Sequence, residues 1–221
     1  MQNAEFRMQK RFCGSMRHLV FLLSAFCILY FSVVSAQQPL DRLLARIGTT
    51  AVTETDVKAA VGLGLVDAQS ADNPDALKQV IDRQLMLVEI ARFPPPEPPP
   101  DAVDKQLEMM KMHAGDGLMG LLHETGLDEM RLRNLARDTL RIQAYVAQRF
   151  GTSRQVTNDE VRRYYDEHQA QFMRDGKVIP FEEAEADARR LASAARLRDA
   201  ISQWVSELRM RAEVVEVKKT R

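Results

Sequence analysis

The stretch Val156–Phe172, VTNDEVRRYYDEHQAQF, carries the clearest helix signal in the chain. Thr157 can cap the first turn, and Glu160, three residues later, completes a capping box. The apolar, aromatic and imidazole side chains that follow recur at helical spacing, at Val161, Tyr164, Tyr165, His168 and Phe172. Polar residues fill the positions between them, so the pattern predicts one amphipathic helix over 156–172. Its tyrosine face should pack against the core helices and the final long helix.

The N-terminal segment predicts export. A basic start is followed by an uncharged run of 18 residues over 19–36, which ends in small residues at Val34-Ser35-Ala36. This order is typical of a secretory signal, so we expect residues 1–36 to be a signal peptide cleaved after Ala36. The run is also at the lower limit of a membrane span, so an uncleaved inner-membrane anchor is the alternative. Both cysteines, Cys13 and Cys27, lie within it, which leaves none for a disulfide or metal site in the mature chain.

The charge balance and the composition indicate the fold class and argue against one class of partner. The chain has 31 basic and 31 acidic residues, and the part after residue 36 has a mild net charge of −3. Such a balance argues against a nucleic-acid partner, which would favour a basic face. The ten glycines and the high share of Ala, Leu, Glu, Arg and Met predict a mainly α-helical fold.

Hydrophobic periodicity and capping signals predict a series of helices. Thr53 and Asp56 form a capping box before one of them, and Pro74 suits the first position of the next, which is the most apolar and should be the central core helix. The run PPPEPPP over 94–100 forbids helix; we interpret it as a stiff spacer, with a proline-recognition ligand as the alternative. The remaining helices are expected over 101–113, 118–124, 128–150 and 181–210.

Only two segments have the alternation of strands. One covers 42–52 and turns at Gly48-Thr49; the other covers 212–217. Since a lone strand needs a partner, we expect 214–217 to pair with 43–47 or with 51–53. The predicted fold is therefore mainly α, with a small antiparallel sheet formed by an N-terminal hairpin and the C-terminal strand.

No catalytic constellation is recognisable. His123-Glu124 lacks the second histidine of a zinc-protease helix, and no nucleophile elbow or phosphate loop is present. Paired carboxylates such as Glu182-Glu183 lie at expected helix N-termini, where the helix dipole favours them. We therefore predict no catalytic residue, no metal site and no cofactor.

Methionines are the remaining unusual feature. They cluster between residues 109 and 130, and methionine is common on binding surfaces that accept many shapes. Core filling is the competing interpretation, and it is preferred for Met110 and Met130, which fit helical stripes. Met109 and Met112 lie off the stripe and should be exposed. The candidate client-binding residues are Met109, Met112, Met119, Leu118, Leu121 and Leu122.

The order of these pieces resembles the SurA-type periplasmic chaperones. The motif A-x-I-x-x-x-x-V-T-x-x-D-V runs from Ala45 to Val57, and V-T-x-x-E-V-x-x-Y-Y-x-x-H-x-x-x-F runs from Val156 to Phe172. The family's long helix, acidic-start helix, leucine-glycine-leucine turn, basic helix and closing strand are matched at Leu77–Leu85, Asp101–Leu107, Leu122–Leu127, Arg131–Arg149 and Arg209–Val215. The resemblance implies a SurA-like chaperone domain over 37–217, with a helical module over about 40–155, a joint helix over 156–172, and a long helix and strand over 181–217.

One departure from the family concerns activity. The parvulin prolyl isomerase domain would follow Phe172, but only 173–180 separate it from the last helix. The resemblance therefore implies a non-enzymatic, ATP-independent holdase that binds unfolded exported or outer-membrane proteins in the periplasm. The alternatives are a membrane-anchored assembly subunit with one fixed partner and, less favoured, a prolyl isomerase with an atypical site. Contact with the membrane is expected only through an uncleaved N-terminal segment, and a homodimer is left open.

Overall fold

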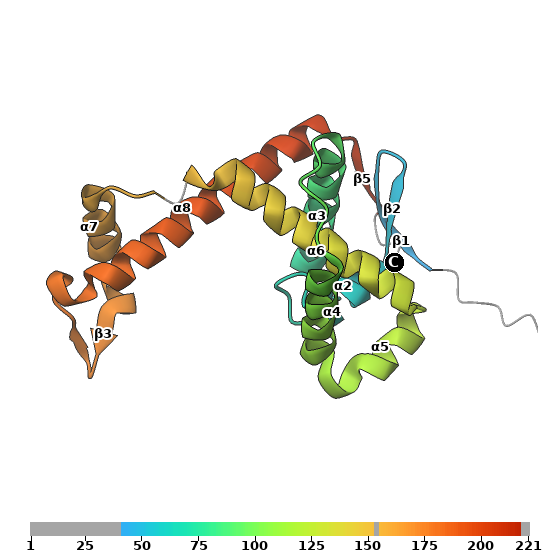
Figure 1. Ribbon diagram of the computed structural model, residues 1–221, viewed down its shortest axis with the longest axis horizontal. Helices are drawn as coiled ribbons and strands as arrows, with labels where there is room; N and C mark the ends of the chain where they lie inside the picture. The colour runs from blue at the N-terminus through green and yellow to red at the C-terminus, as the bar shows by residue number, and fades with distance from the viewer. Residues whose placement is uncertain (1–40, 153–154, 218–221) are drawn as a thin grey trace, which may run out of the picture. The chain divides into compact units, whose positions relative to one another are not determined.

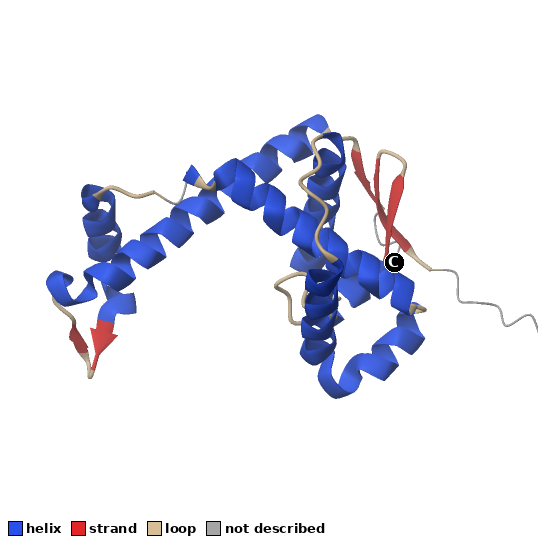
Figure 2. Cartoon of the chain, viewed as in Figure 1, coloured by secondary structure: helices blue, strands red, loops and turns tan. Residues whose placement is uncertain are grey.

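The chain from Asp41 onward is mainly α-helical with a small antiparallel sheet, as predicted (Figure 1, Figure 2). The computed structural model describes residues 41–152 and 155–217. The predicted signal segment over 1–36, with both cysteines, lies outside the described residues. None of the described helices combines the length and the apolar character that a membrane crossing requires.

The sheet joins the two ends of the described chain. It consists of β1 (Leu43–Ile47), β2 (Thr50–Thr53) and β5 (Val214–Glu216) in the order β2-β1-β5. β5 pairs antiparallel with β1, and Ile47 lies opposite Val214. This confirms the first of the two predicted pairings. Ala45 and Ile47 are buried on the inner face, in agreement with the alternation in the sequence.

Two helices cover this sheet. α2 (Glu54–Gly62) begins at the predicted capping box of Thr53 and Asp56. α3 (Pro74–Arg92) begins after an Asn73 cap, with proline in its first turn. The first core comprises buried residues of the sheet, α2, α3 and two later helices, over 129–150 and 181–211: Ala45, Ile47, Val52, Val57, Ala60, Ala76, Val80, Ile81, Leu85, Ile90, Tyr145, Trp204, Val205 and Leu208. Not every apolar residue of α3 belongs to this core, because Val88 is exposed.

A helical lobe follows the proline run. It contains α4 (Pro100–Ala114), the 3₁₀ turn η1 (Gly115–Gly117), α5 (Leu118–Thr125) and α6 (Glu129–Phe150). Gly126 ends α5 in a left-handed conformation with φ 64°. The second core consists of Leu63, Val103, Leu107, Met110, Leu132 and Ala136.

The Val156–Phe172 stretch is where helix prediction was partly wrong. The capping box is confirmed, since Glu160 accepts from the Thr157 amide at 2.7 Å, but α7 is shorter (Asn158–Glu167). His168 leaves the helical conformation, and the 3₁₀ helix η3 (Gln169–Phe172) returns Phe172 to the apolar side. The Tyr164 and His168 rings stack with centroids 4.1 Å apart.

The tyrosine face packs on one of its two expected partners, the final long helix, and not on the other. The third core comprises Val161, Tyr165, Phe172, Ala184 and Ala188, with Val156, Tyr164, Ile179, Phe181 and Leu191 packed around it. α7 therefore packs on the first half of α8 (Phe181–Arg211), and the third core contains no residue of α3, α4 or α6. The expected contact of α7 with the core helices was wrong, because α8 carries α7 on its N-terminal half and reaches the first core with its C-terminal half, through Trp204 and Leu208.

A second hairpin is present that strand alternation did not reveal. β3 (Met173–Arg174) and β4 (Lys177–Val178) pair antiparallel around Asp175-Gly176, whose φ values are both positive. Asp-Gly favours this two-residue turn, so the turn chemistry was a usable signal. The strands were missed because two residues are too few to show alternation.

Helical spacing in the sequence predicts one apolar stripe along α8, and the structure departs from it in the first half of the helix. The stripe comprises Leu191, Ala194, Leu197, Ile201, Trp204, Val205 and Leu208. Trp204, Val205 and Leu208 are buried as expected, but Ala194 is exposed. In the first half the buried face consists of Ala184, Ala188 and Ala192 instead. A single stripe fails here because α8 packs against different elements at its two ends.

Candidate functional site

Among the described residues, most methionine side chains are exposed to solvent, whereas nearly all leucine side chains are buried or half-buried. Eight of the 11 methionines lie in the described residues, and six of these are exposed, at 51–79% of their full surface. Of the 18 leucines in the same residues, only Leu43 is exposed. The six exposed methionines are Met109, Met112, Met119, Met130, Met173 and Met210. Single exposed apolar residues are ordinary, and Phe93 and four valines are exposed as well, but methionine is the most frequent exposed large hydrophobe among the described residues.

The predicted binding residues divide into two groups. Met109 and Met112 on α4 and Met119 on α5 are exposed, as predicted for the first two. Leu118, Leu121 and Leu122 are half-buried and pack against the second core. Leu121 lies so close to α2 that a Cβ at Gly62 would stand 2.7 Å from its Cδ2. The structure thus gives the three leucines a packing contact and leaves the methionines available to a partner.

Met130 was assigned to the core, and this was wrong. It is 72% exposed. Leu132 and Ala136 turn toward the second core, and Met130 precedes Leu132 by two residues, about 200° around the helix. Met130 therefore points away from the second core and joins the exposed methionines, whereas Met110 is buried as expected.

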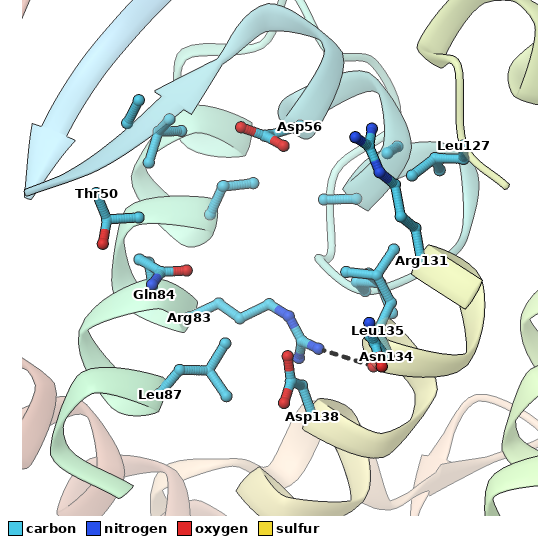
Figure 3. A pocket seen from close by; sticks show the side chains of 16 residues that line it. Thr50, Asp56, Arg83, Gln84, Leu87, Leu127, Arg131, Asn134, Leu135 and Asp138 are labelled. Atoms are coloured by element: carbon cyan, nitrogen blue, oxygen red, sulfur yellow. Dashed lines mark hydrogen bonds between the residues drawn. The ribbon is translucent and has the colours of Figure 1, made fainter. Parts of the chain in front are cut away.

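A cavity of 390 Å³ lies beside β2, and sequence reasoning missed it (Figure 3). Its walls come from β2, α2, α3 and α6, with Leu127 from the loop before α6. Polar side chains from three helices line it: Asp56, Arg83, Gln84, Arg131, Asn134 and Asp138. Figure 3 shows Arg83 extending from α3 across the cavity toward α6.

Arg83 is the most constrained charge in this cavity. Its Nη2 donates to the Leu135 carbonyl at 3.2 Å and to the Thr139 hydroxyl at 2.8 Å. Burial lowers the pKa of Arg83 from its ordinary value, and the Asp138 carboxylate opposes that shift. The guanidinium stays charged at any physiological pH, so the surroundings hold a poorly hydrated cation. The sequence held no signal for Arg83, because it is one of six charged residues along α3.

Among residues 41–152 and 155–217, no three His, Cys, Asp or Glu side chains are close enough together to hold a metal ion. The geometry offers polar and apolar contacts to a ligand.

No model of a known protein family matches the chain, and no curated protein matches it either.

Proposed function

We propose that this protein is an ATP-independent holdase chaperone that binds unfolded exported polypeptides, outer-membrane proteins among them, in the periplasm, and that it is not an enzyme. The observation that carries the proposal is the exposure of six methionines in a chain that buries or half-buries all but one of its described leucines. The resemblance of the sequence to SurA-type chaperones agrees with this function, and the predicted signal peptide agrees with the location.

Methionine suits this task because its side chain is unbranched and polarizable and adapts to irregular partners. Full burial of one such side chain contributes about 1.5–3 kcal/mol. Association costs more than that, so several methionines must be engaged before binding is detectable. An extended, unfolded chain can reach several of them at once, whereas a folded protein presents few apolar groups. Weak contacts of this kind also allow release without ATP.

The proposal is tested by aggregation of a chemically denatured client, diluted into buffer and followed by light scattering. The mature protein should suppress scattering without a cofactor. Met109→Glu with Met112→Glu should need several times more protein for the same protection, because a carboxylate on the contact surface must be desolvated. Met109→Leu with Met112→Leu should keep most of the protection.

A matched control separates surface chemistry from added charge. Gln143→Glu with Gln148→Glu places the same two charges on exposed positions of α6 and should leave protection unchanged. Circular dichroism checks that all variants are folded. Absence of protection by the wild-type protein, or full protection by the Met→Glu variant, would overturn the proposal. A stoichiometric complex with one cellular protein, without general protection, would assign the chain to the assembly subunits instead.

A further inference from the structure

A second cavity lies between α3, α6 and α8, and it differs in charge from the one in Figure 3. It has a volume of about 490 Å³ and is open to solvent. α3 contributes one wall at Lys78, Asp82 and Met86, and α8 contributes the facing wall at Arg198, Ile201, Ser202, Val205 and Arg209. Positions three or four apart lie on one side of a helix, which is why these residues line a common groove. We call it the α3–α8 groove.

Basic side chains dominate the rim of the α3–α8 groove. Lys78, Arg83, Arg198 and Arg209 line it together with a single carboxylate, Asp82. Asp82 is already bound, because Arg209 Nε donates to it and forms a partly buried ion pair. Arg209 Nη2 also donates to the Lys78 carbonyl at 2.9 Å, which fixes that end of the groove. The groove therefore has an excess of positive charge after its internal pair is counted.

Two of the cations are free to accept a ligand. Lys78 and Arg198 are exposed and form no ion pair within the described part of the chain. Arg83 lines both cavities, and its Nη2 is used by α6. Because burial already disfavours the charge of Arg83, an anion in the α3–α8 groove would be attracted more strongly there than at an open surface.

Apolar side chains form most of the rest of the lining, beside the uncharged polar residues Gln79, Ser202 and Ser206. Leu65 and Val66 from the loop after α2, Met86, Ile142, Ile201 and Val205 face the groove. A ligand with an anionic group next to an apolar one would satisfy both parts, and the volume lies in the range of small-ligand pockets, enough for one or two side chains. A purely apolar ligand would leave the cations without counterions, and a hydrophilic anion would leave the apolar lining exposed.

We propose that the α3–α8 groove binds a carboxylate of the client polypeptide together with the apolar residue beside it. The carboxylate is that of an Asp or Glu side chain or of the chain terminus. This inference rests on the proposed holdase function and adds a preference to it: among equally apolar segments, those with a neighbouring carboxylate bind more tightly.

Three fluorescent peptides with the same apolar sequence test the preference by anisotropy. One contains a single Glu and an amidated C-terminus, one contains Gln and a free C-terminus, and one contains Gln and an amidated C-terminus. Two partly exposed ion pairs amount to roughly fivefold in affinity, so the Glu peptide, the free-carboxylate peptide or both should bind about fivefold more tightly than the neutral one. The preference should shrink when the salt concentration rises from 50 to 300 mM, since exposed charges are screened.

Matched variants test whether the preference for a carboxylate depends on the cations of the α3–α8 groove. Lys78→Gln with Arg198→Gln should reduce it to less than twofold. Lys105→Gln with Arg190→Gln removes the same charge from exposed positions outside the groove and should retain it. Equal binding of the three peptides to the wild-type protein, or an undiminished preference in the groove variant, would refute the proposal. Loss of binding to anionic phospholipid vesicles in the groove variant, with no peptide preference in the wild type, would refute it in favour of a lipid headgroup.

The two proposals fail in different ways. If the wild-type protein suppresses client aggregation but ranks the three peptides equally, only the groove proposal is wrong. If it neither suppresses aggregation nor binds any of the peptides, the holdase function itself is wrong.

Discussion

Two neighbouring residues of β5 direct their main-chain N–H groups to opposite sides, one to β1 and the other to the open edge of the sheet. The Val217 amide donates to the Leu44 carbonyl at 2.8 Å, and the Gly48 amide donates to the Glu213 carbonyl at 3.1 Å. Every second residue of an antiparallel strand turns its main-chain groups to the same neighbour. Val215 therefore also faces β1, whereas the amide of Glu216 faces the open edge. Since proline removes an N–H, Val215→Pro and Glu216→Pro should have different effects.

The size of the difference follows from the hydrogen bonds. Val215→Pro removes one ladder bond, worth about 1 kcal/mol, and leaves the Arg46 carbonyl opposite without a donor, at about 1–2 kcal/mol more. In a unit of this size each kcal/mol lowers Tm by about 2–4 °C, so the expected fall is roughly 4–12 °C. Glu216→Pro should lower Tm by less than about 2 °C, because proline is tolerated where an edge strand turns its N–H to solvent.

Thermal unfolding followed by circular dichroism at 222 nm measures both variants. Val215→Thr is the side-chain control: it keeps a β-branched residue and the N–H at an outward-facing, exposed position and should melt close to the wild type. Equal melting temperatures for the two proline variants would show that the register of β5, and with it the closure of the sheet, is wrong.

Three further predictions concern stability, each checked by denaturant or thermal unfolding. Gly64→Ala should lower the free energy of unfolding by about 1–2 kcal/mol, because Gly64 has φ +66° and faces a histidine ring. Gly120→Ala, in open space within α5, should raise it by about 0.5–1 kcal/mol. Equal effects of the two substitutions would contradict the backbone assignment. Leu208→Ala in the first core should cost about 2–4 kcal/mol, and Leu197→Ala, outside all three cores, less than about 1 kcal/mol; a reversed order would place the core elsewhere on α8. Hydrogen bonds from Thr157 lower the pKa of Glu160 below its ordinary 4.5, so the stabilisation is present above that pH and lost as the pH falls through the folded-state value. The Tm advantage of wild type over Glu160→Gln at pH 7 should therefore disappear in acid, and a constant difference from pH 7 to pH 3 would refute the capping role.

Local signals predicted most of the elements because they act within a few residues. The caps at Thr53, Asn73–Pro74 and Asp128 determine where helices begin, and each lies at or within one residue of the predicted start. The pairing of β5 with the N-terminal hairpin was predictable by elimination, but the sequence left open whether β1 or β2 is the partner. His168 was placed in one continuous helix because spacing alone does not distinguish an α-helix from an α-helix followed by a 3₁₀ turn, and both bring Phe172 to the apolar side.

The candidate sites were less predictable, because burial depends on which neighbours a helix meets. Met110 and Met130 both fit a stripe, but only Met110 faces α6 and the second core. The α3–α8 groove combines residues more than 100 positions apart in the sequence, such as Lys78 and Arg198. No local pattern could have shown that these two charges share a cavity.

The β3–β4 hairpin has a consequence for how this architecture tolerates change. Arg174 and Lys177 are paired across the Asp175-Gly176 turn, so the chain enters and leaves the hairpin at adjacent points. Below the turn, the Ile179 amide donates to the Phe172 carbonyl at 2.8 Å, and the Tyr165 hydroxyl donates to the Ile179 carbonyl at 2.6 Å. These bonds hold the base of the hairpin independently of the turn. A foreign domain whose own termini lie close together can therefore replace Asp175-Gly176 and leave the packing of α7 on α8 intact. This turn is thus a position that tolerates domain insertion.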